Sequence, residues 1–423
     1  MGVKVFKFGG ASVKDAASLQ NVVEIVQRYP TDKLVLVASA MGKTTNALEE
    51  IMTACWNKDE TSFFHLLNKL SEQHLIVLKN LFPDPNHLIH VEIQSVFTTL
   101  ESRIHLPQGT SYDFEYDQIV SLGEVISTLI LNAILVQANL ASVWVDAREI
   151  IRTNANHREG EIDWNTTESK MKPLFDSLFV ANDMIVIQGF LCHTAEGNTT
   201  TLGREGSDFT AGICAYCMNA EQVTIWKDVP GMLNADPRKF ENTVKLDQIS
   251  FYEAIELSYY GASVIHPKTV KPLQNKNIPL YVKSFIDPEA NGTVIQSSKE
   301  FDHLIPSFIS KNKQVLISIT PKDFSFIEEE NLGKIFAVLS AQNIKINMMQ
   351  NSALSFSIAL DQEKVKLPEL IAALADYSIT YNDNLELVTI RHYNEKTVQD
   401  LKGKKEVVLE QKTRETVRFL LKG

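Results

Sequence analysis

The sequence has few cysteines and no surplus of positive charge. Four cysteines in 423 residues are too few for a disulfide framework, so we expect a reducing compartment, the cytoplasm. Acidic residues outnumber basic ones by 52 to 41, which gives a net charge of −11. Because binding to phosphate backbones needs a basic face, we expect no nucleic-acid partner. Hydrophobic and charged contents of 44% and 22% exclude a disordered chain.

Long apolar runs are also scarce, and only the stretch 125–145 lacks a formal charge over a length that could span a membrane. It contains polar residues such as Asn132, Gln137 and Asn139, whose side chains lipid would leave without partners. We therefore predict a buried helix that ends near Asn139, then a short strand at 141–145, and no membrane association. The N-terminus starts with a strand-like run and not with a targeting signal.

Short runs rich in β-branched residues alternate with helical patterns in the first part of the chain. The runs are 3–8, 33–39, 141–147, 183–190 and 222–229. Helical spacing is clear between them, for example over 18–28 and 208–219. This alternation predicts an α/β fold, a doubly wound, mainly parallel sheet with helices on both faces in three αβα layers. A longer helical stretch, 46–138, is expected to form a lobe on the substrate side.

The C-terminal part has a different order of elements. A more polar stretch, 296–313, is expected to be a linker between a first domain, 1–295, and a second region, 314–423. The elements expected in that region are strand 314–319, helix 331–342, strands 344–350 and 355–361, helix 367–377, strand 385–393, and a hairpin of 407–412 with 416–421. The βαββα order is more than half of a ferredoxin-like unit. The remainder leaves no obvious place for a complete second helix.

A glycine-rich turn follows the first strand. In KFGGASV, Gly9 and Gly10 end the strand and Lys7 lies just before them. Backbone N–H groups of such a turn can approach phosphate oxygens closely, and a helix N-terminus favours the anion. Ordinary strand-to-helix turns have the same pattern, so it decides nothing by itself.

Two further motifs admit two interpretations each. ASAMGKTTN at 38–46 lacks the first glycine of a P-loop, because position 37 is Val, but Ser39 and Thr45 could bind a ligand or cap the next helix. In SLGEVIS, Glu124 lies in an apolar helix, where a carboxylate is costly unless it is paired. Its partner is either an internal basic side chain or a cationic ligand.

The strongest local motif is TLGREGSDFTA at 201–211. Two glycines flank Arg204, whose planar guanidinium suits a carboxylate. Ser207 ends the turn, and Asp208 is expected to cap the helix that follows. With two glycines and an arginine beside it, Asp208 is also a candidate site residue.

A strand followed by a charged loop occupies 225–238, with the sequence IWKDVPGMLNADPR. Lys227, Asp228, Asp236 and Arg238 lie in or next to this loop. Open α/β sheets bind nucleotides in loops at the carboxyl ends of their strands, so these residues are candidates for a nucleotide site.

Taken in this order, the motifs resemble those of aspartokinases, which belong to the amino acid kinase superfamily. The matching strings are KFGGASV (7–13), SAMGKTTN (39–46), SLGE (121–124), TLGREGSD (201–208), IWKDVPG (225–231), DPR (236–238) and YGASVIHPKT (260–269). The resemblance implies an amino-acid-kinase domain followed by ferredoxin-like ACT regulatory domains. It implies transfer of a phosphoryl group from ATP, with Mg²⁺, to the β-carboxylate of L-aspartate, the first step of lysine, threonine and methionine biosynthesis. It also implies a homodimer or larger homo-oligomer formed through the ACT region.

The resemblance assigns roles to the candidate residues. Lys7 and Asp208 are expected to be catalytic. The substrate is expected to contact Ser39, Thr45, Glu124, Arg204 and Ser207, and ATP to contact Lys7, Gly9, Gly10, Lys227, Asp228, Asp236 and Arg238. Ser352 and Asn331 are expected at an effector site. Since a β-carboxylate is already ionised at pH 7, catalysis needs no general base.

Four residues depart from the family pattern. Ala11 stands where Thr or Ser is usual, and Glu205 stands where a second glycine is common. Ser263 replaces a lysine that usually faces ATP, and we expect Lys227 to supply this cation. Ala353 replaces the acidic residue of the effector turn, so the sequence does not identify the amino acid, if any, that regulates the enzyme.

Two other functions are considered, another kinase of the superfamily and an inactive amino-acid sensor. SLGE, TLGREGSD and the ACT region together argue against the first, and the intact Lys7 and Arg204 argue against the second. Cys214 and Cys217 form a C-x-x-C without a second pair at zinc-site spacing, so we expect both to be buried. The histidines form no ligand cluster, which leaves Mg²⁺ to be held by ATP phosphates.

Overall fold

The computed structural model describes residues 2–105, 109–262, 265–323, 325–403 and 405–422. The chain forms two compact units. The first unit consists of Met1–Met232, Lys245–Ile255 and Val264–Lys299, and the second of Leu233–Val244, Glu256–Ser263 and Glu300–Gly423. Two short segments that precede residue 264 therefore fold with the C-terminal unit.

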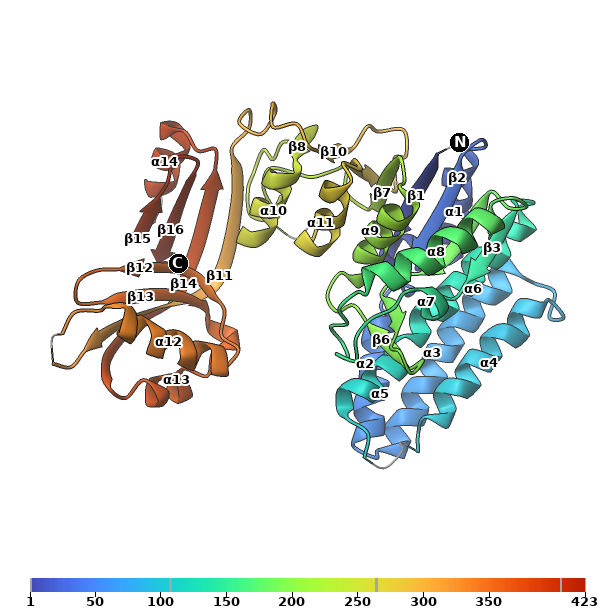
Figure 1. Cartoon of the computed structure of the whole chain (residues 1–423), viewed down its shortest axis with the longest axis horizontal. Coiled ribbons are helices and arrows are strands. Elements are labelled where there is room, and N and C mark those ends of the chain that lie inside the picture. The colour runs from blue at the N-terminus through green and yellow to red at the C-terminus, as the bar shows by residue number, and fades with distance from the viewer. Residues whose placement is uncertain (1, 106–108, 263–264, 324, 404, 423) are drawn as a thin grey trace. The chain divides into compact units, whose positions relative to one another are not determined.

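An eight-stranded sheet forms the centre of the first unit, in the order β3-β4-β2-β1-β7-β9-β10-β8 (Figure 1). The strands are β1 (Val3–Phe8), β2 (Lys33–Ala38), β3 (Ser142–Val145), β4 (Met184–Gln188), β7 (Gln222–Lys227), β8 (Gln248–Ser250), β9 (Leu280–Ser284) and β10 (Thr293–Gln296). All neighbours pair in parallel except β9 and β10, which are antiparallel. The predicted mainly parallel sheet is confirmed.

Helices cover both faces of this sheet because successive strand residues point to opposite sides. In β1, Phe6 and Phe8 belong to a cluster with residues of α1 (Ala16–Gln27) and α6 (Leu122–Gln137). Helix α9 (Gly206–Met218) packs on the other face, and α8 (Trp164–Leu178) and α11 (Pro267–Asn275) pack against α9. The three predicted αβα layers are therefore present.

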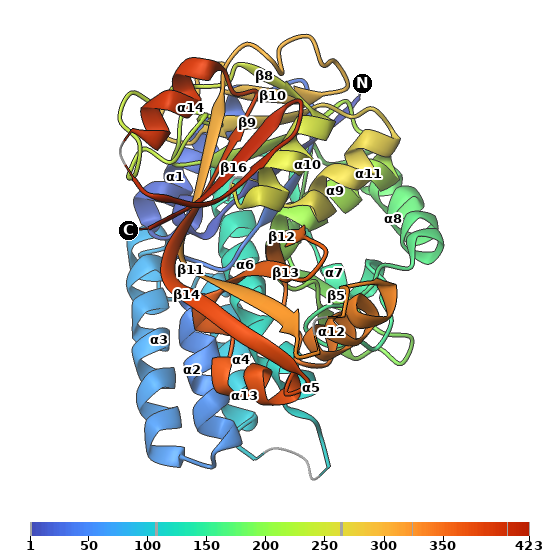
Figure 2. The same ribbon diagram turned by 90° about the vertical axis from the view of Figure 1, so that its left-hand side faces the viewer.

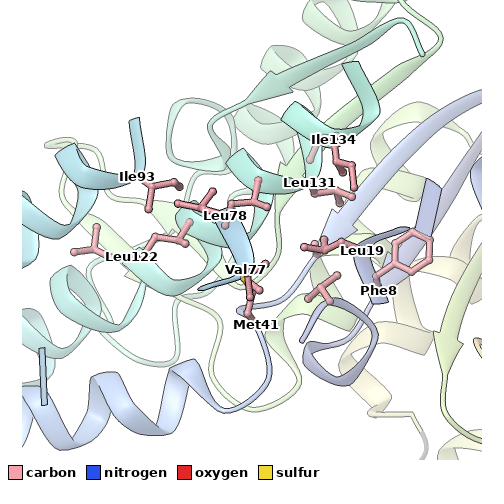
Figure 3. Packing of buried hydrophobic residues seen from close by; sticks show 14 of the residues in the cluster. Phe8, Leu19, Met41, Val77, Leu78, Ile93, Leu122, Leu131 and Ile134 are labelled. Carbon is pink, nitrogen blue, oxygen red and sulfur yellow. The ribbon is translucent and has the colours of Figure 1, made fainter. Parts of the chain in front are cut away.

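The predicted helical lobe is also present. It consists of α2 (Thr44–Trp56), α3 (Glu60–Leu81), α4 (Leu88–Ser102) and α5 (Tyr112–Val120), which Figure 2 shows beside α6. Its buried side chains, such as Leu48 and Ile93, are part of the same hydrophobic cluster as Phe8. Figure 3 shows this cluster extending from Phe8 and Leu19 to Val77 and Ile93. One continuous core thus joins the lobe to the sheet.

The uncharged stretch is a core helix followed by a strand, as predicted. Helix α6 ends at Gln137, and β3 begins at Ser142. Among the described residues, Tyr112–Gln137 is the helical run that is long and apolar enough to cross a membrane. However, 78% of its most apolar window is buried inside the protein.

Short elements complete the first unit. They are the 3₁₀ helix η1 (Gly10–Val13), helix α7 (Ala147–Ile150), the hairpin of β5 (Leu191–His193) and β6 (Thr199–Thr201), and the start of α10 (Phe251–Tyr260). Cys214 and Cys217 are buried in α9, as expected.

The second unit contains a six-stranded antiparallel sheet in the order β12-β13-β11-β14-β16-β15. The elements are β11 (Ser307–Pro321), α12 (Glu329–Ala341), β12 (Ile346–Asn351), β13 (Phe356–Asp361), η2 (Gln362–Lys364), α13 (Leu367–Ala373), β14 (Tyr377–Arg391), α14 (Glu395–Lys402), β15 (Val407–Lys412) and β16 (Thr416–Lys422). Strands β11 and β14 pair from Ser307 with Arg391 to Pro321 with Tyr377. Both long strands are therefore shared by the half of the sheet that contains β12 and β13 and the half that contains β15 and β16. The ACT-like, antiparallel character of this region is confirmed.

Two predictions for this unit are wrong in detail. Strand β11 begins at Ser307 and not at Gln314, because the backbone of the polar stretch pairs with β14 even where Lys311 and its neighbours are hydrophilic. The supposedly helix-free polar stretch contains α14, which Asn394 caps in a capping box with Thr397. Its few apolar residues gave too weak a helical pattern to be recognised.

Candidate active site

A cavity of about 830 Å³ lies in the first unit at the carboxyl ends of β1, β2 and β7. Strand ends position its cationic and hydroxyl groups, since Lys7 is the penultimate residue of β1, Ser39 follows β2 and Lys227 ends β7. The cavity brings together eight predicted residues, namely Lys7, Ser39, Thr45, Glu124, Arg204, Ser207, Asp208 and Lys227.

The other predicted residues do not line this cavity. Gly9 and Gly10 lie directly after β1, and Asp228 is exposed after β7. Asp236 and Arg238 belong to the second unit, where the Arg238 Nη2 atom donates to Asp236 Oδ2 over 2.8 Å. The effector candidates Ser352 and Asn331 also lie in the second unit.

Asp208 lies between two lysine ammonium groups. Lys7 Nζ is 2.6 Å from Oδ1 of Asp208, and Lys227 Nζ is 3.5 Å from Oδ2. Burial by itself would raise the pKa of Asp208, but the two ammonium groups hold the pKa of this carboxyl below its usual value. Asp208 is therefore ionised at neutral pH and fixes both lysines at the cavity wall.

The start of α9 differs from the prediction. The helix begins at Gly206 after Glu205, which has a left-handed conformation with φ of 55°, so Asp208 lies inside the first turn and does not cap the helix. The expectation that Asp208 is the N-cap is wrong because Gly206 allows an earlier start. A Cβ atom there would lie 2.6 Å from Cδ2 of Phe190. Asp208 still benefits from the positive end of the helix dipole.

Glu205 introduces a second carboxyl beside Asp208. Burial, and then the charge of Asp208, raise the pKa of Glu205, and its Oε2 atom is buried without a hydrogen-bond partner among the described residues. A left-handed conformation at a residue with a Cβ costs about 1 kcal/mol. The family's more common glycine would avoid both effects.

Glu124 is buried in α6 and faces the cavity. Burial raises the pKa of its carboxyl to about 8, against weaker opposing contributions that include the backbone N–H of Ala40 and the charge of Lys7. The Oε2 atom has no hydrogen-bond partner in the described parts of the chain. This geometry favours a cationic ligand over an internal basic partner.

Arg204 supplies a positive charge to the same cavity. Its side chain lines the cavity, is exposed, and forms no hydrogen bond or ion pair with any other described side chain. The guanidinium fork is therefore available to a ligand carboxylate, for which it is geometrically suited.

The two glycine turns are held together through their backbones. The N–H of Gly42 donates to the carbonyl of Gly10 over 2.9 Å, and a Cβ atom on Gly10 would lie 2.9 Å from the carbonyl oxygens of Ala40 and Gly42. Only glycine fits this close approach. The turn after β1 and the turn after β2 are therefore held tightly against each other. Such a rigid backbone fits the phosphate-binding turn predicted for Gly9 and Gly10.

Sequence reasoning missed part of the cavity rim. Tyr116, His157 and Arg158 line it, and the guanidinium carbon of Arg158 lies 4.3 Å from the centre of the Tyr116 ring. His157 Nδ1 is 2.9 Å from Oδ2 of the buried Asp117. The only signal was a polar His-Arg pair in the loop NANHREG, and nothing in the sequence places that loop opposite α5.

Comparisons with known proteins identify the family of this chain. A family model described as the amino acid kinase family matches residues 2–284. Aspartokinase 1, chloroplastic, of Arabidopsis thaliana is 30% identical over 91% of this chain and 68% of its own length. Lysine-sensitive aspartokinase 3 of Escherichia coli is 30% identical over 85% of this chain and 78% of its own length. The crystal structure of E. coli aspartokinase III with aspartate and ADP matches with a TM-score of 0.82 at 26% identity, and covers 100% of this chain and 96% of that one.

The open sheet, the glycine turns and a cavity in which two lysines flank Asp208 fit a kinase that transfers phosphoryl groups to small molecules. The chain belongs to the amino acid kinase family and, within it, to the aspartokinases. Its enzyme class is accordingly that of phosphotransferases with a carboxyl group as acceptor.

Proposed function

We propose that this chain is an aspartate kinase that transfers the γ-phosphoryl group of ATP to the β-carboxylate of L-aspartate. The observation that carries this proposal is the charge arrangement of one cavity. A pair of lysines flanks Asp208, while the buried Glu124 carboxyl and the Arg204 guanidinium each lack an ion-pair partner among the described residues.

The ammonium and α-carboxylate groups of an amino-acid substrate match these two residues. The ammonium group of aspartate would pair with Glu124, and the α-carboxylate with the fork of Arg204. Hydroxyls of Ser39, Thr45 and Ser207 face the same space and can donate to substrate oxygens. With both ends of the amino-acid moiety held, the β-carboxylate is left to face the lysines.

The transfer itself depends on position and charge. One oxygen of the β-carboxylate forms a bond to the γ-phosphorus, and the bond from that phosphorus to the bridging oxygen breaks, so that ADP leaves with the electron pair. Lys7 and Lys227 counter the negative charge that is spread over the transferring group. Their ion pairs with Asp208 fix the ammonium groups before substrate arrives, which avoids reorganisation during the reaction.

Nucleotide use follows from the family, and Mg²⁺ is part of the proposal. Among the described residues, no three His, Cys, Asp or Glu side chains group as a metal site. Mg²⁺ prefers to keep phosphate and water ligands, so we propose that it enters bound to ATP and supplies charge neutralisation there. Asp228, Asp236 and Arg238 are still proposed to contact ATP. Ser263 lies outside the described residues.

We further propose that the catalytic domain lies within residues 1–295, and that residues 314–423 belong to an ACT regulatory region that mediates homo-oligomer formation in the cytoplasm. Of the expected linker, 296–313, the part from Ser307 onward already belongs to β11 of that region. Ser352 and Asn331 are proposed effector residues. The Ser352 hydroxyl shares a hydrogen bond with that of Ser355, and Asn331 Oδ1 accepts from the hydroxyl of Tyr377 over 2.9 Å. An effector would compete with these internal contacts.

Hydroxylamine trapping tests the proposed function directly. The full chain is incubated with ATP, Mg²⁺ and hydroxylamine, with L-aspartate or L-glutamate as acceptor, and the hydroxamate is measured with and without lysine or threonine. We expect product with aspartate only, and much slower product formation for Lys7→Ala. Product with glutamate would reassign the substrate, and absence of product with either acceptor would favour an amino-acid sensor.

A further inference from the structure

A second cavity lies wholly within the C-terminal unit. It has a volume of about 770 Å³ and is lined by the end of α10, by α12 and β12, and by the β15–β16 hairpin. Its wall contains the two cations Arg418 and Lys345 and no aspartate or glutamate. The pocket therefore carries net positive charge, although the chain as a whole has a net charge of −11.

Arg418 is the central group of this pocket. It is partly buried, its Nε donates to the hydroxyl of Thr389, and its Nη2 donates to the carbonyl of Asn347 over 2.6 Å. That carbonyl is available because a bulge in β12 separates Ile346 and Met348 in their pairing with β13. These two contacts use one edge of the guanidinium and hold it in place.

The other edge of Arg418 has no anionic partner. No described residue forms an ion pair with it, and its guanidinium carbon lies 4.9 Å from the centre of the Tyr260 ring. Burial disfavours the charged form and lowers the pKa of Arg418, yet an arginine stays protonated in proteins. The result is a fixed, partly desolvated cation with free donors on the Nη1 side.

The remaining wall combines neutral polar side chains, such as Asn343 and Gln411, with a larger apolar and aromatic part. Tyr259, Phe336 and Met349 all line the pocket, and all three are among the exposed large hydrophobic side chains of the protein. Lys345 lies on the rim, is exposed, and has no ion-pair or hydrogen-bond partner among the described residues. A ligand that fits both features carries one negative charge and an apolar body.

We propose that this Arg418 pocket binds a small carboxylate that has an apolar or aromatic body. The carboxylate would accept hydrogen bonds from the free edge of Arg418, and the body would cover Tyr259, Phe336 and Met349. The pocket includes neither Ser352 nor Asn331, so it is separate from the proposed effector turn. The proposal does not depend on the activity of the first unit.

Benzoate and its neutral analogue benzamide test the charge requirement on the full chain. Ligand-observed NMR titrations are run with saturating L-aspartate present, so that Arg204 is occupied. We expect benzoate to bind at least ten times more tightly than benzamide, because a charge-assisted hydrogen bond contributes about a ten- to hundredfold gain. Equal affinities, or no binding of benzoate, would overturn the proposal.

Variants locate the binding. Arg418→Gln should weaken benzoate at least tenfold, whereas Arg414→Gln, which removes the same charge from an exposed turn of the same hairpin, should leave the affinity unchanged. Because Arg418 also joins β16 to β12, a second variant avoids its structural contacts. Ser340→Trp, at an exposed position of the pocket wall, should block binding without disturbing the fold.

The expected pattern is loss of binding in Arg418→Gln and Ser340→Trp with retention in Arg414→Gln. Unchanged binding in Ser340→Trp would overturn the proposal even if Arg418→Gln proves unstable. If sedimentation shows that wild-type subunits associate through this surface and that benzoate does not bind to the assembly, the occupant is a second copy of the chain and the proposal is wrong.

Discussion

The ammonium group of Lys7 lies 2.6 Å from Oδ1 of Asp208, and both side chains are almost fully buried. Loss of one member of a buried pair leaves the other without compensation. The pair therefore does two things in this protein. It stabilises the end of β1 against the first turn of α9, and it keeps a cation at the place where phosphoryl charge develops.

Lys7→Ala should lower kcat by about 10²- to 10³-fold, the usual effect of removing one stabilising donor from a transition state. The KM for aspartate should change little, because Glu124 and Arg204 remain. Steady-state kinetics by hydroxamate formation provide the measurement, and circular dichroism checks the fold. Near-normal turnover in a folded Lys7→Ala protein would remove Lys7 from the chemistry.

Arg204→Ala should act mainly on the KM for aspartate. Loss of a charge-assisted, bidentate contact should raise this KM by roughly ten- to hundredfold. Arg414→Ala is the matched control, because Arg414 is exposed in the C-terminal unit and should leave the KM unchanged. An unaltered KM in Arg204→Ala would show that the α-carboxylate is bound elsewhere.

Glu124 makes aspartate binding dependent on pH. Its pKa of about 8 means that the carboxyl is mostly protonated in the ligand-free protein at pH 7, whereas pairing with an ammonium group requires the carboxylate. Binding should therefore release up to one proton below pH 8, and affinity should rise with pH until that value. Calorimetry at pH 7 in two buffers of different ionisation enthalpy measures the release.

Glu124→Gln is the control for this proton release. The amide cannot titrate, so binding should become weaker and independent of buffer. The same raised pKa means that the folded protein holds a proton that the unfolded chain has lost between about pH 4.5 and pH 8. Stability should consequently fall with rising pH in this window, and less so in the variant. Proton release that persists in Glu124→Gln would contradict the assignment.

Lys227→Ala should raise the KM for ATP. Ser263 stands where the family usually has a lysine that faces ATP, and Lys227 is proposed to supply that positive charge instead. Its distance of 3.5 Å to Asp208 is longer than that of Lys7, so the variant should fold normally. Initial rates at varied ATP and saturating aspartate measure the effect. An unchanged ATP KM would refute the nucleotide role.

Gly10→Ala tests the backbone contact between the two turns. The new Cβ would meet two carbonyl oxygens at 2.9 Å, so the free energy of unfolding should fall by about 1–3 kcal/mol and activity should drop. Gly9→Ala is milder, because the nearest atom to its Cβ is the flexible Lys7 Nζ at 3.4 Å. Chemical denaturation compares the two, and equal stabilities would exclude a steric role for Gly10.

The strand and helix order of the first unit could be predicted because apolar β-branched runs, glycine turns and helical spacing agree with one another there. Most of the proposed site could be predicted for the same reason, since parallel strands bring their carboxyl ends to one edge. Lys7, Ser39 and Lys227 meet because three separate strands end beside one another.

Features that depend on tertiary contacts could not be predicted. Helix α9 begins at Gly206, directly after the left-handed Glu205, so Asp208 lies inside the first turn and does not cap the helix. Arg158 reaches the cavity only because its loop packs beside Tyr116. In the C-terminal unit, the strand beginning at Ser307 was hidden by polar residues whose backbone, and not whose side chains, decides the pairing.

The shared strands β11 and β14 have a consequence for engineering chimeric enzymes. One end of β11 pairs with β13, and the far end of β14 pairs with β16, while β11 and β14 pair with each other at both ends with register shifts between. The half of the sheet with β12 and β13 and the half with β15 and β16 therefore share the same two long strands. A cut placed after Arg391 would expose the side of β14 that β16 covers, and would leave an unpaired edge prone to aggregation. Recombination between relatives should therefore exchange residues 307–422 as one indivisible cassette.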